Sequence, residues 1–118
     1  MAERFASPQV TVLTGASGWL GRALVHRLLA DRSRHRLRLL AHTTAEGNEL
    51  QALGNVEIIV GDIAKPDTAA RLLYGAGTDA DLIHTVGVIH PQNTRQFFDV
   101  NLTGTRNVAD AALDHGVR

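Results

Sequence analysis

The chain has 118 residues, of which 44% are apolar and 20% are charged, a composition typical of one soluble globular domain. The 12 basic and 12 acidic residues balance, so no overall field attracts nucleic acid or an anionic membrane surface. Cysteine is absent, which excludes disulfides and thiolate metal sites and fits a reducing compartment.

Short apolar runs alternate with amphipathic patterns along the chain. Val10–Thr14 is a continuous apolar run of the kind that forms a strand buried on both faces of a parallel sheet. The next pattern predicts a helix over Trp19–Arg32, because leucines recur there at every fourth position. The further predicted strands are Leu37–Ala41, Val56–Val60 and Leu82–Val88, and the further predicted helices are Glu46–Leu53, Lys65–Tyr74 and Asn93–His115. Helices between short strands predict an α/β fold with parallel pairing and right-handed crossovers.

Four arginines alternate with other residues where the first helix passes into the second strand: Arg32, Arg34, Arg36 and Arg38. We interpret them as a solvated helix end that offsets the helix dipole. A nucleic-acid patch is the alternative, and the balanced charge disfavours it.

Three glycines, Gly15, Gly18 and Gly21, stand at three-residue intervals between the first strand and its helix. A glycine-rich turn at a helix start exposes unpaired N–H groups and the positive end of the helix dipole to an anion. In a dinucleotide site the first glycine makes the tight turn, the second lets the pyrophosphate approach and the third lets helix and sheet pack closely. No Lys-Ser/Thr pair follows, so a P-loop is disfavoured. The alternative is that the glycines serve the turn alone.

The stretch "TGASGWLG" (Thr14–Gly21) resembles the TGxxGxxG fingerprint of the extended short-chain dehydrogenase/reductases, in the branch of NAD-dependent epimerases and dehydratases. Three further landmarks follow in the order of that family: "GD" at Gly61-Asp62, "DLIH" at Asp81–His84, and "VNLTGTRNVADAALDHGVR" at Val100–Arg118. The resemblance implies one NAD(P)-binding domain of the Rossmann type over residues 1–118, with residues 1–9 as a flexible lead. It implies about four parallel strands in the order 3-2-1-4, with helices on both faces.

The resemblance also implies which residues contact a nicotinamide dinucleotide. Asp62 and Ile63 would contact adenine, and Asn101 would support a proton relay without itself being catalytic. The remaining cofactor-binding residues implied are Gly15, Ser17, Gly18, Trp19, Leu20, Gly21, His42, Thr85, Val86 and Gly87. Two of these assignments have plain structural alternatives, since Asp62 suits a cap within its turn and Asn101 suits an exposed helix surface.

Family members that prefer NAD place an acid at the end of the second strand, about 20 residues beyond the glycines. This chain reads "LLAHTT" (Leu39–Thr44) there, with no carboxylate. The absence of this acid slightly favours NADP over NAD, because His42 and the threonines could donate hydrogen bonds to a 2′-phosphate. "HTVG" (His84–Gly87) also departs from the "HxAA" usual in the family.

The family transfers hydride with the help of a Tyr-x-x-x-Lys pair, in which the tyrosine acts as general acid and base. The only tyrosine here is Tyr74 and the only lysine is Lys65, in the wrong order and spacing. We therefore expect this chain alone to be inactive. His42, His84 and His90 lack the spacing of zinc ligands, so no metal site is expected.

Two functions remain open from the sequence. The first is the cofactor-binding part of an epimerase, dehydratase or other oxidoreductase of this superfamily, acting on a sugar nucleotide or a similar alcohol or ketone. The alternative is a stand-alone, non-catalytic NAD(P)-binding sensor or partner-binding protein. A third reading, a reductase that only positions cofactor and substrate, has no residue pattern in its favour.

The expected partners are a nicotinamide dinucleotide and either a second copy of the chain or a missing C-terminal half. Self-association is expected because the fourth strand would be an exposed sheet edge and the helix Asn93–His115 would keep an apolar face. We expect no nucleic-acid or membrane partner. Residues Met1–Gln9 lack the apolar core of a signal peptide, and no run reaches the roughly 20 apolar residues of a membrane span, so a cytoplasmic location is expected.

Overall fold

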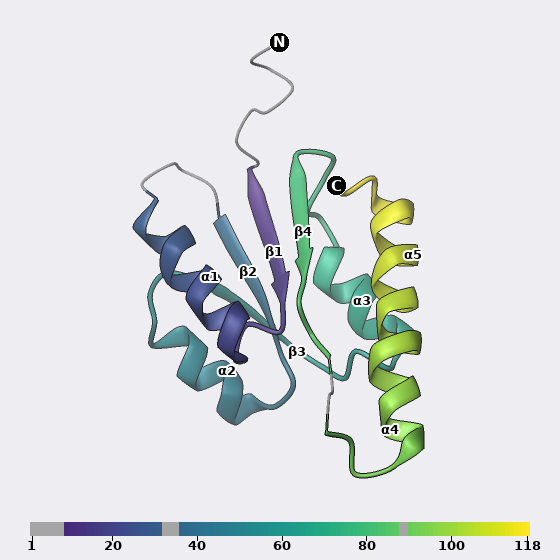
Figure 1. The fold of residues 1–118 in the computed structure, drawn as a ribbon. Helices are drawn as coiled ribbons and strands as arrows, with labels where there is room; N and C mark the ends of the chain where they lie inside the picture. The colour runs from purple at the N-terminus through teal and green to yellow at the C-terminus, as the bar shows by residue number, and fades with distance from the viewer. Residues whose placement is uncertain (1–8, 32–35, 88–89) are drawn as a thin grey trace.

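A computed structural model describes residues 9–31, 36–87 and 90–118. Four parallel strands form one sheet in the order β3-β2-β1-β4, as Figure 1 shows. The elements in chain order are β1 (Val10–Thr14), α1 (Trp19–Ala30), β2 (Arg36–Ala41), α2 (Thr44–Gln51), β3 (Glu57–Val60), α3 (Pro66–Leu73), β4 (Ala80–His84), α4 (Thr94–Phe98), the π-helix η2 (Asp99–Gly104) and α5 (Thr105–His115). The predicted Rossmann-type fold, strand order and helical cover on both faces are confirmed.

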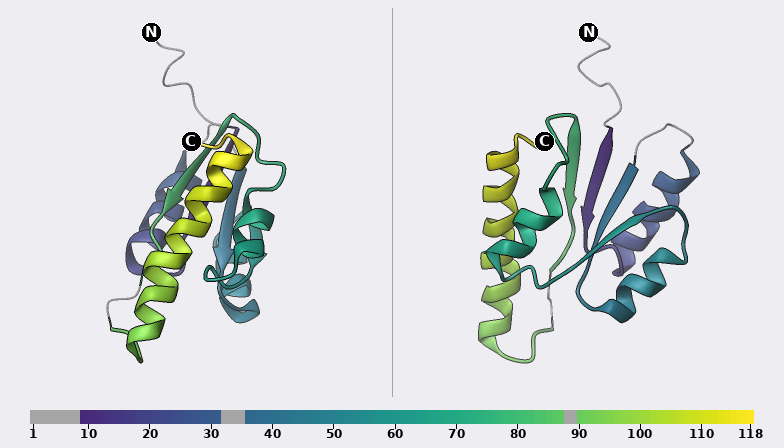
Figure 2. Two further views of the ribbon diagram at one scale, coloured as in Figure 1. Left: turned by 90° about the vertical axis from the view of Figure 1, so that its right-hand side faces the viewer. Right: turned by 180° about the vertical axis from the view of Figure 1, so that it is seen from behind.

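The sheet separates two apolar clusters. On one face α1 and α2 pack over Leu13, Leu39 and Val56. On the other face α3 and α5 pack over Val10, Val12 and Leu40. Figures 1 and 2 show these two helical layers on opposite sides of the strands. Neighbouring residues of β1 and β2 thus point to opposite layers, which requires the continuously apolar strands seen in the sequence.

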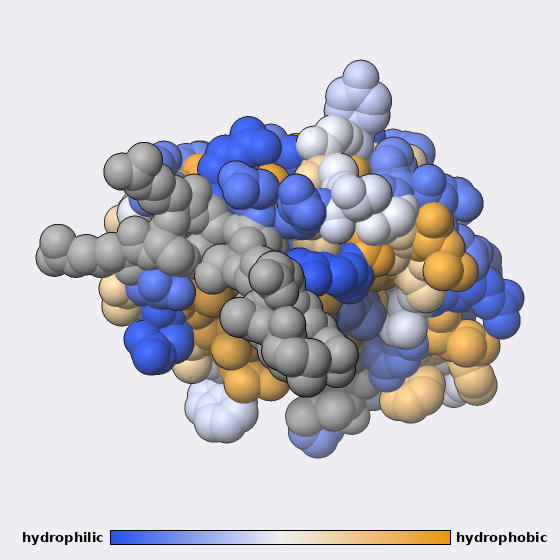
Figure 3. All heavy atoms as spheres, turned by 90° about the horizontal axis from the view of Figure 1, so that it is seen from above, coloured by the Kyte–Doolittle hydropathy of each residue, from blue (hydrophilic) through white to orange (hydrophobic). Residues whose placement is uncertain are grey.

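Strand register brings the carboxyl ends of β1, β2 and β4 together. Thr14 pairs with His84 across β1 and β4, and Leu13 pairs with Leu39 across β1 and β2. The loops after these strands therefore open at one edge of the sheet. In sheets of this kind that edge, on both sides of the first strand, is where ligands bind. Figure 3 views the opposite edge, where hydrophobic residues occur in small groups between hydrophilic ones on the part of the surface that is described.

Several predicted boundaries need correction. The fourth strand was predicted over Leu82–Val88, but β4 begins at Ala80 and ends at His84. It ends early because the backbone N–H of Thr85 turns toward Thr14 Oγ1 at 3.1 Å. The first helix ends at Ala30, and Arg32 and Val88 lie outside the described residues.

The long helix predicted over Asn93–His115 is three segments: α4, the π-helix η2 and α5. The wider π turn runs over Asp99–Gly104, and the hydroxyl of Thr105 donates back to the carbonyl of Asn101 at 2.7 Å. Such back-bonding and π turns both bend helices, and π turns are frequent at functional sites. Asn101, for which the resemblance implied a supporting role, lies within this π turn.

Residues outside the four strands also form backbone hydrogen bonds at the margins of the sheet. Residues 1–8 of the expected lead lie outside the described residues, but Gln9 already bonds to Asp79 and Arg36 through its backbone. At the outer edge of β4, the N–H of Arg118 donates to the carbonyl of Ala80 and its carbonyl accepts from Leu82. The chain's last residue is therefore paired with the strand that was expected to be an open edge.

Arg38 contradicts the prediction of a solvated arginine series. Arg38 is only 6% exposed, and its guanidinium donates to the carbonyls of Leu72 and Tyr74, both at 2.8 Å. Nε lies 3.2 Å from Glu57 without the alignment of a hydrogen bond, so the pair is an ionic contact. Arg38 thus satisfies the last carbonyls of α3, which the helix itself leaves unpaired. Arg36 is exposed, and Arg32 and Arg34 lie outside the described residues.

Replacing Arg38 with Ala should lower the free energy of unfolding by about 2–4 kcal/mol, because the buried carbonyl of Leu72 and the partly buried carbonyl of Tyr74 lose a charged donor. Glu57→Gln, which removes only the ionic contact at a side chain that is 44% exposed, should cost less than about 1 kcal/mol. Urea denaturation followed by far-ultraviolet circular dichroism measures both. Equal losses in the two variants would show that the ion pair, and not the carbonyl bonds, carries the contribution.

Candidate functional site

The turn after β1 is built on a close approach that only glycine permits. Gly15 has φ +71°, and a Cβ there would lie 2.7 Å from the backbone nitrogen of Val86. A Cβ on Gly21 would lie 1.9 Å from the carbonyl oxygen of Gly15. The first glycine therefore lets the turn pack on the loop after β4, and the third lets α1 pack on the turn.

Gly18 differs from its two neighbours. The nearest atom that a Cβ there would meet is the carbonyl oxygen of Gly15, at 3.3 Å. Gly18 is the N-cap of α1, and no side chain of the described residues caps that helix. The first-turn N–H groups of a 12-residue helix are thus free of a side-chain partner at its positive end. These features fit a pyrophosphate better than they fit a packing role.

A cavity opens beside this turn at the carboxyl ends of the strands. Five of the residues that the resemblance implied line it together, from four separate segments of the chain. The lining residues are Gly15, Ser17, Leu40, His42, Glu46, Gly61, Ile63 and Val86. A second, adjoining hollow brings His42 and Asp62 together with residues from α4 and η2. The fold thus joins the glycine turn to the loops after β2, β3 and β4, as a dinucleotide site requires.

The loop after β3 is fixed from three sides. Asp62 Oδ1 accepts from the N–H of Ala64 at 2.9 Å, so one carboxylate oxygen holds the loop itself. Ile63 is 5% exposed, and its carbonyl accepts from Asn107 Nδ2 at 3.0 Å. A Cβ on Gly104 would lie 2.9 Å from Ile63 Cγ2, so η2 also packs against the loop. Asp62 therefore holds its own turn through Oδ1 but does not cap α3, whose N-cap is Lys65. Its Oδ2 has no partner among the described residues.

A chain of hydrogen bonds joins the ends of β1 and β4 to α5. Thr14 Oγ1 lies 2.7 Å from His84 Nδ1, and His84 Nε2 lies 3.0 Å from Thr105 Oγ1. Thr14 Oγ1 also accepts from the N–H of Thr85. The hydroxyl of Thr85 donates to the carbonyl of Thr14 at 2.7 Å, which explains how a threonine fits in "HTVG".

The same contacts assign the tautomer of His84. Thr105 donates its single hydroxyl proton to the carbonyl of Asn101, so its oxygen accepts from His84 Nε2–H. Nδ1 is then the acceptor for the Thr14 hydroxyl. Burial lowers the pKa of His84 below its ordinary value of 6.5. The neutral imidazole is the form that this network holds.

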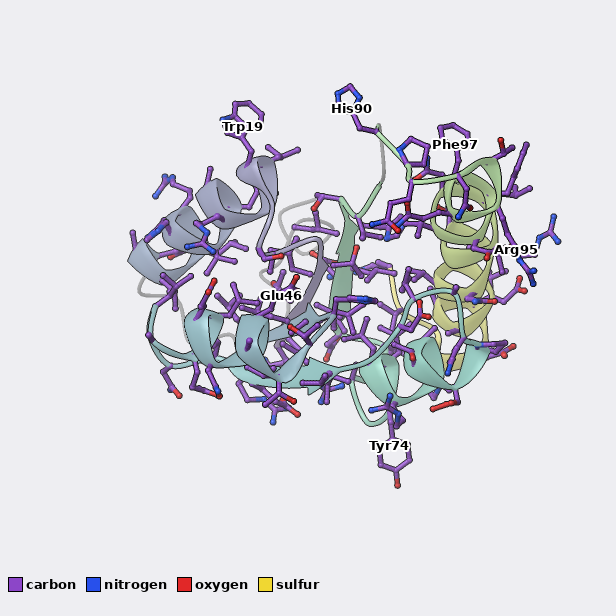
Figure 4. All side chains as sticks on the ribbon, turned by 90° about the horizontal axis from the view of Figure 1, so that it is seen from below. Trp19, Glu46, Tyr74, His90, Arg95 and Phe97 are labelled. Carbon is purple, nitrogen blue, oxygen red and sulfur yellow. The ribbon has the colours of Figure 1, made fainter. Side chains whose placement is uncertain are left out.

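Not every implied residue lies at the cavity. Trp19 is 91% exposed, and Figure 4 shows it projecting outward on the same side as His90 and Phe97. Leu20 is exposed beside it, and Gly21 is buried under the turn. Gly87 is exposed next to Asn101, whose Oδ1 would lie 3.5 Å from a Cβ on that glycine. These residues border the turn and the loop after β4 without lining the cavity.

The structure adds residues that sequence reasoning missed. Glu46 is the main one: it lines the cavity from the first turn of α2. Its signal was present in "TTAE" (Thr43–Glu46), which has the spacing of a capping box. Thr105 and Asn107 were also missed, because only the fold brings α5 against the ends of β3 and β4.

Tyr74 lies far from this site. It is 77% exposed at the end of α3, and it projects from the side of the molecule opposite Trp19 in Figure 4. Lys65 is the N-cap of the same helix, at its other end. Within residues 9–31, 36–87 and 90–118, no group of three or more His, Asp or Glu side chains could hold a metal ion. In the same residues, no helix has both the length and the apolar content to cross a membrane.

Residues 12–118 match the 3-beta hydroxysteroid dehydrogenase/isomerase family. The chain belongs to this family. It is of the NAD-dependent epimerase/dehydratase type, so the resemblance to the extended short-chain dehydrogenase/reductases is confirmed.

The chain is also similar to two curated relatives and to a solved dehydrogenase structure. The chain is 36% identical over 117 residues to the uncharacterized protein y4nL of Sinorhizobium fredii and 34% identical over 110 residues to the ceramide reductase of Caulobacter vibrioides. Each alignment covers 92% of this chain and 32% of the relative, so the chain spans about a third of the length of these proteins. A mutant uronate dehydrogenase from Agrobacterium tumefaciens, complexed with NAD, superposes with a TM-score of 0.72 at 26% identity, over 92% of this chain and 37% of that one.

Gly15→Ala and Gly21→Ala should each lower the free energy of unfolding by at least about 2 kcal/mol, because the added methyl meets backbone atoms that cannot move aside. Gly18→Ala, with only one contact at 3.3 Å, should cost no more than about 1 kcal/mol. Chemical denaturation of the three variants measures the difference. Similar losses at all three positions would contradict the distinct role given to Gly18.

The lowered pKa of His84 makes the unfolded chain bind more protons than the folded one below pH 6.5. Stability should therefore be complete above about pH 6.5 and should decline as the pH falls toward the folded-state pKa. Urea midpoints between about pH 5.5 and 7.5 measure this slope. His84→Asn keeps an acceptor for Thr14 and should flatten the slope, whereas His26→Gln, at an exposed position on α1, should leave it. An unchanged slope in His84→Asn would assign it to another group.

Proposed function

We propose that this chain binds a nicotinamide dinucleotide along the carboxyl ends of β1, β2 and β4. The observation that carries the proposal is the start of α1, where no side chain of the described residues caps the N–H groups and Gly18 leaves room above them. Oriented N–H groups and a positive helix end bind phosphate oxygens. The 26% identical uronate dehydrogenase complexed with NAD and the family membership support the choice of a nicotinamide dinucleotide.

Different residues of the site would contact different parts of the cofactor. Gly15, Ser17 and Gly18 would hold the pyrophosphate, with Trp19, Leu20 and Gly21 shaping the turn. His42 would border the adenosine ribose, and Asp62 Oδ2 and the backbone of Ile63 would contact the adenine. Val86 and Gly87 would line the path toward the nicotinamide, with Thr85 fixing their loop to β1. Asn101 would support the same loop from η2.

We further propose that the chain is the cofactor-binding part of an NAD(P)-dependent oxidoreductase or epimerase. A bound nicotinamide ring supplies hydride transfer to or from a substrate carbon. This chain's residues bind and orient the cofactor, and Tyr74 is placed too far from the cavity to exchange a proton with a substrate there. The relatives extend well beyond the length of this chain, and we propose that substrate binding and proton transfer belong to such additional residues.

The non-catalytic alternative rests on the same observation about Tyr74, because a binding module needs no proton donor. Exposed aromatic side chains on α4, Phe97 and Phe98, would suit either a further domain or a second copy of the chain. The two functions differ in whether hydride transfer can be detected when the cofactor is bound. Dinucleotide binding itself is common to both, and it is the first property to measure.

Isothermal titration of the purified chain with NAD, NADP and their reduced forms should show micromolar binding of at least one of them. Gly18→Asp should abolish that binding, because its carboxylate would occupy the place of the pyrophosphate and repel it. Ala23→Asp adds the same charge to an exposed position of α1 and should change the affinity less than about threefold. A folded wild-type chain that binds none of the four compounds would overturn the proposed function.

A further inference from the structure

Glu46 brings a carboxylate to the end of β2, where the sequence alone places none. The N–H of His42 donates to Glu46 Oε2 at 2.9 Å. In return, Thr43 Oγ1 accepts from the N–H of Glu46 at 3.2 Å. The two bonds hold the carboxylate against the strand-to-helix turn, as in a capping box, except that Glu46 accepts from the residue before the N-cap.

The position of this carboxylate is inside the candidate site. Glu46 is half-buried and lines the same cavity as Gly15, Ser17 and His42. Figure 4, seen from the carboxyl ends of the strands, places it near the middle of that end of the molecule. Within the described part of the chain no lysine or arginine pairs with it, whereas the next acid on α2, Glu49, faces Arg22 at 3.7 Å.

NAD and NADP differ only at the 2′ position of the adenosine ribose, which lies beyond the end of the second strand in this fold. A ribose hydroxyl can donate to Glu46. A 2′-phosphate would instead meet an unpaired negative charge in a partly desolvated place, where repulsion is stronger than in water. It would also find one backbone donor of this turn, the N–H of His42, already bonded to the carboxylate.

We infer that Glu46 makes this site selective for NAD over NADP. The inference rests on the proposed dinucleotide function and concerns one residue of that site. It reverses the slight preference for NADP that "LLAHTT" indicates. No acid stands at the end of β2 itself, but Glu46 in the first turn of α2 brings a carboxylate to the same turn. Glu46 is a specificity residue and takes no part in proton transfer.

The test compares dissociation constants for NAD and NADP by isothermal titration at low ionic strength. The wild type should bind NAD at least about tenfold more tightly than NADP. Glu46→Gln keeps an oxygen for the N–H of His42 and removes the charge, so it should shift the ratio toward NADP by about tenfold, mainly through tighter NADP binding. Glu46→Lys should shift it further. Glu49→Gln makes the same change on the same helix outside the cavity and should leave the ratio as it is.

The outcomes distinguish a failure of the selectivity of Glu46 from a failure of the dinucleotide site. If the wild type binds both dinucleotides and prefers NADP, or if Glu46→Gln and Glu46→Lys leave the ratio unchanged while retaining wild-type circular dichroism, the inference is wrong and the dinucleotide site stands. If the folded wild type binds neither compound, the proposed function fails and the selectivity of Glu46 fails with it.

Discussion

The carboxyl ends of β1 and β4 are joined by hydroxyl and imidazole groups, and the other parts of the site depend on this joint. Thr14 bonds to His84 and Thr85, and His84 reaches Thr105 on the far side. Each group donates one proton and accepts another, so the network fixes the neutral tautomer of His84 and the direction of every bond. It also holds the loop after β4 close enough to Gly15 that no side chain fits between them.

The segments η2 and α5 connect this hydrogen-bond network to the loop after β3, which lines another part of the cavity. The π turn of η2 places Gly104 against Ile63, and Asn107 holds the carbonyl of the same residue. The helix that runs from η2 into α5 therefore positions the loop after β3 and, through Thr105, the end of β4. The π turn lies in the segment that meets both of these parts of the site.

Membership in the 3-beta hydroxysteroid dehydrogenase/isomerase family and the geometry of the turn at Gly18 support the same chemistry from independent directions. The start of α1, beside the cavity, offers backbone N–H groups and a helix dipole, which suit phosphate. The cavity lining includes Glu46, whose carboxylate suits ribose hydroxyls. These opposite charge preferences match the phosphate and the ribose of the proposed dinucleotide.

The sequence by itself determined the alternation of strands and helices and the glycine turn, because apolar periodicity and glycine spacing are local features that each segment carries alone. The strand order was predicted only through the resemblance to the short-chain dehydrogenase/reductases. It did not determine that Arg38 is buried, that β4 ends at His84, or that Glu46 reaches the cavity. Those outcomes depend on partners from distant segments: the carbonyls at the end of α3, the hydroxyl of Thr14, and the turn that α2 makes over β2. Only the tertiary structure brings these groups together, since a polar side chain's environment is set by what packs against it rather than by its neighbours in the chain.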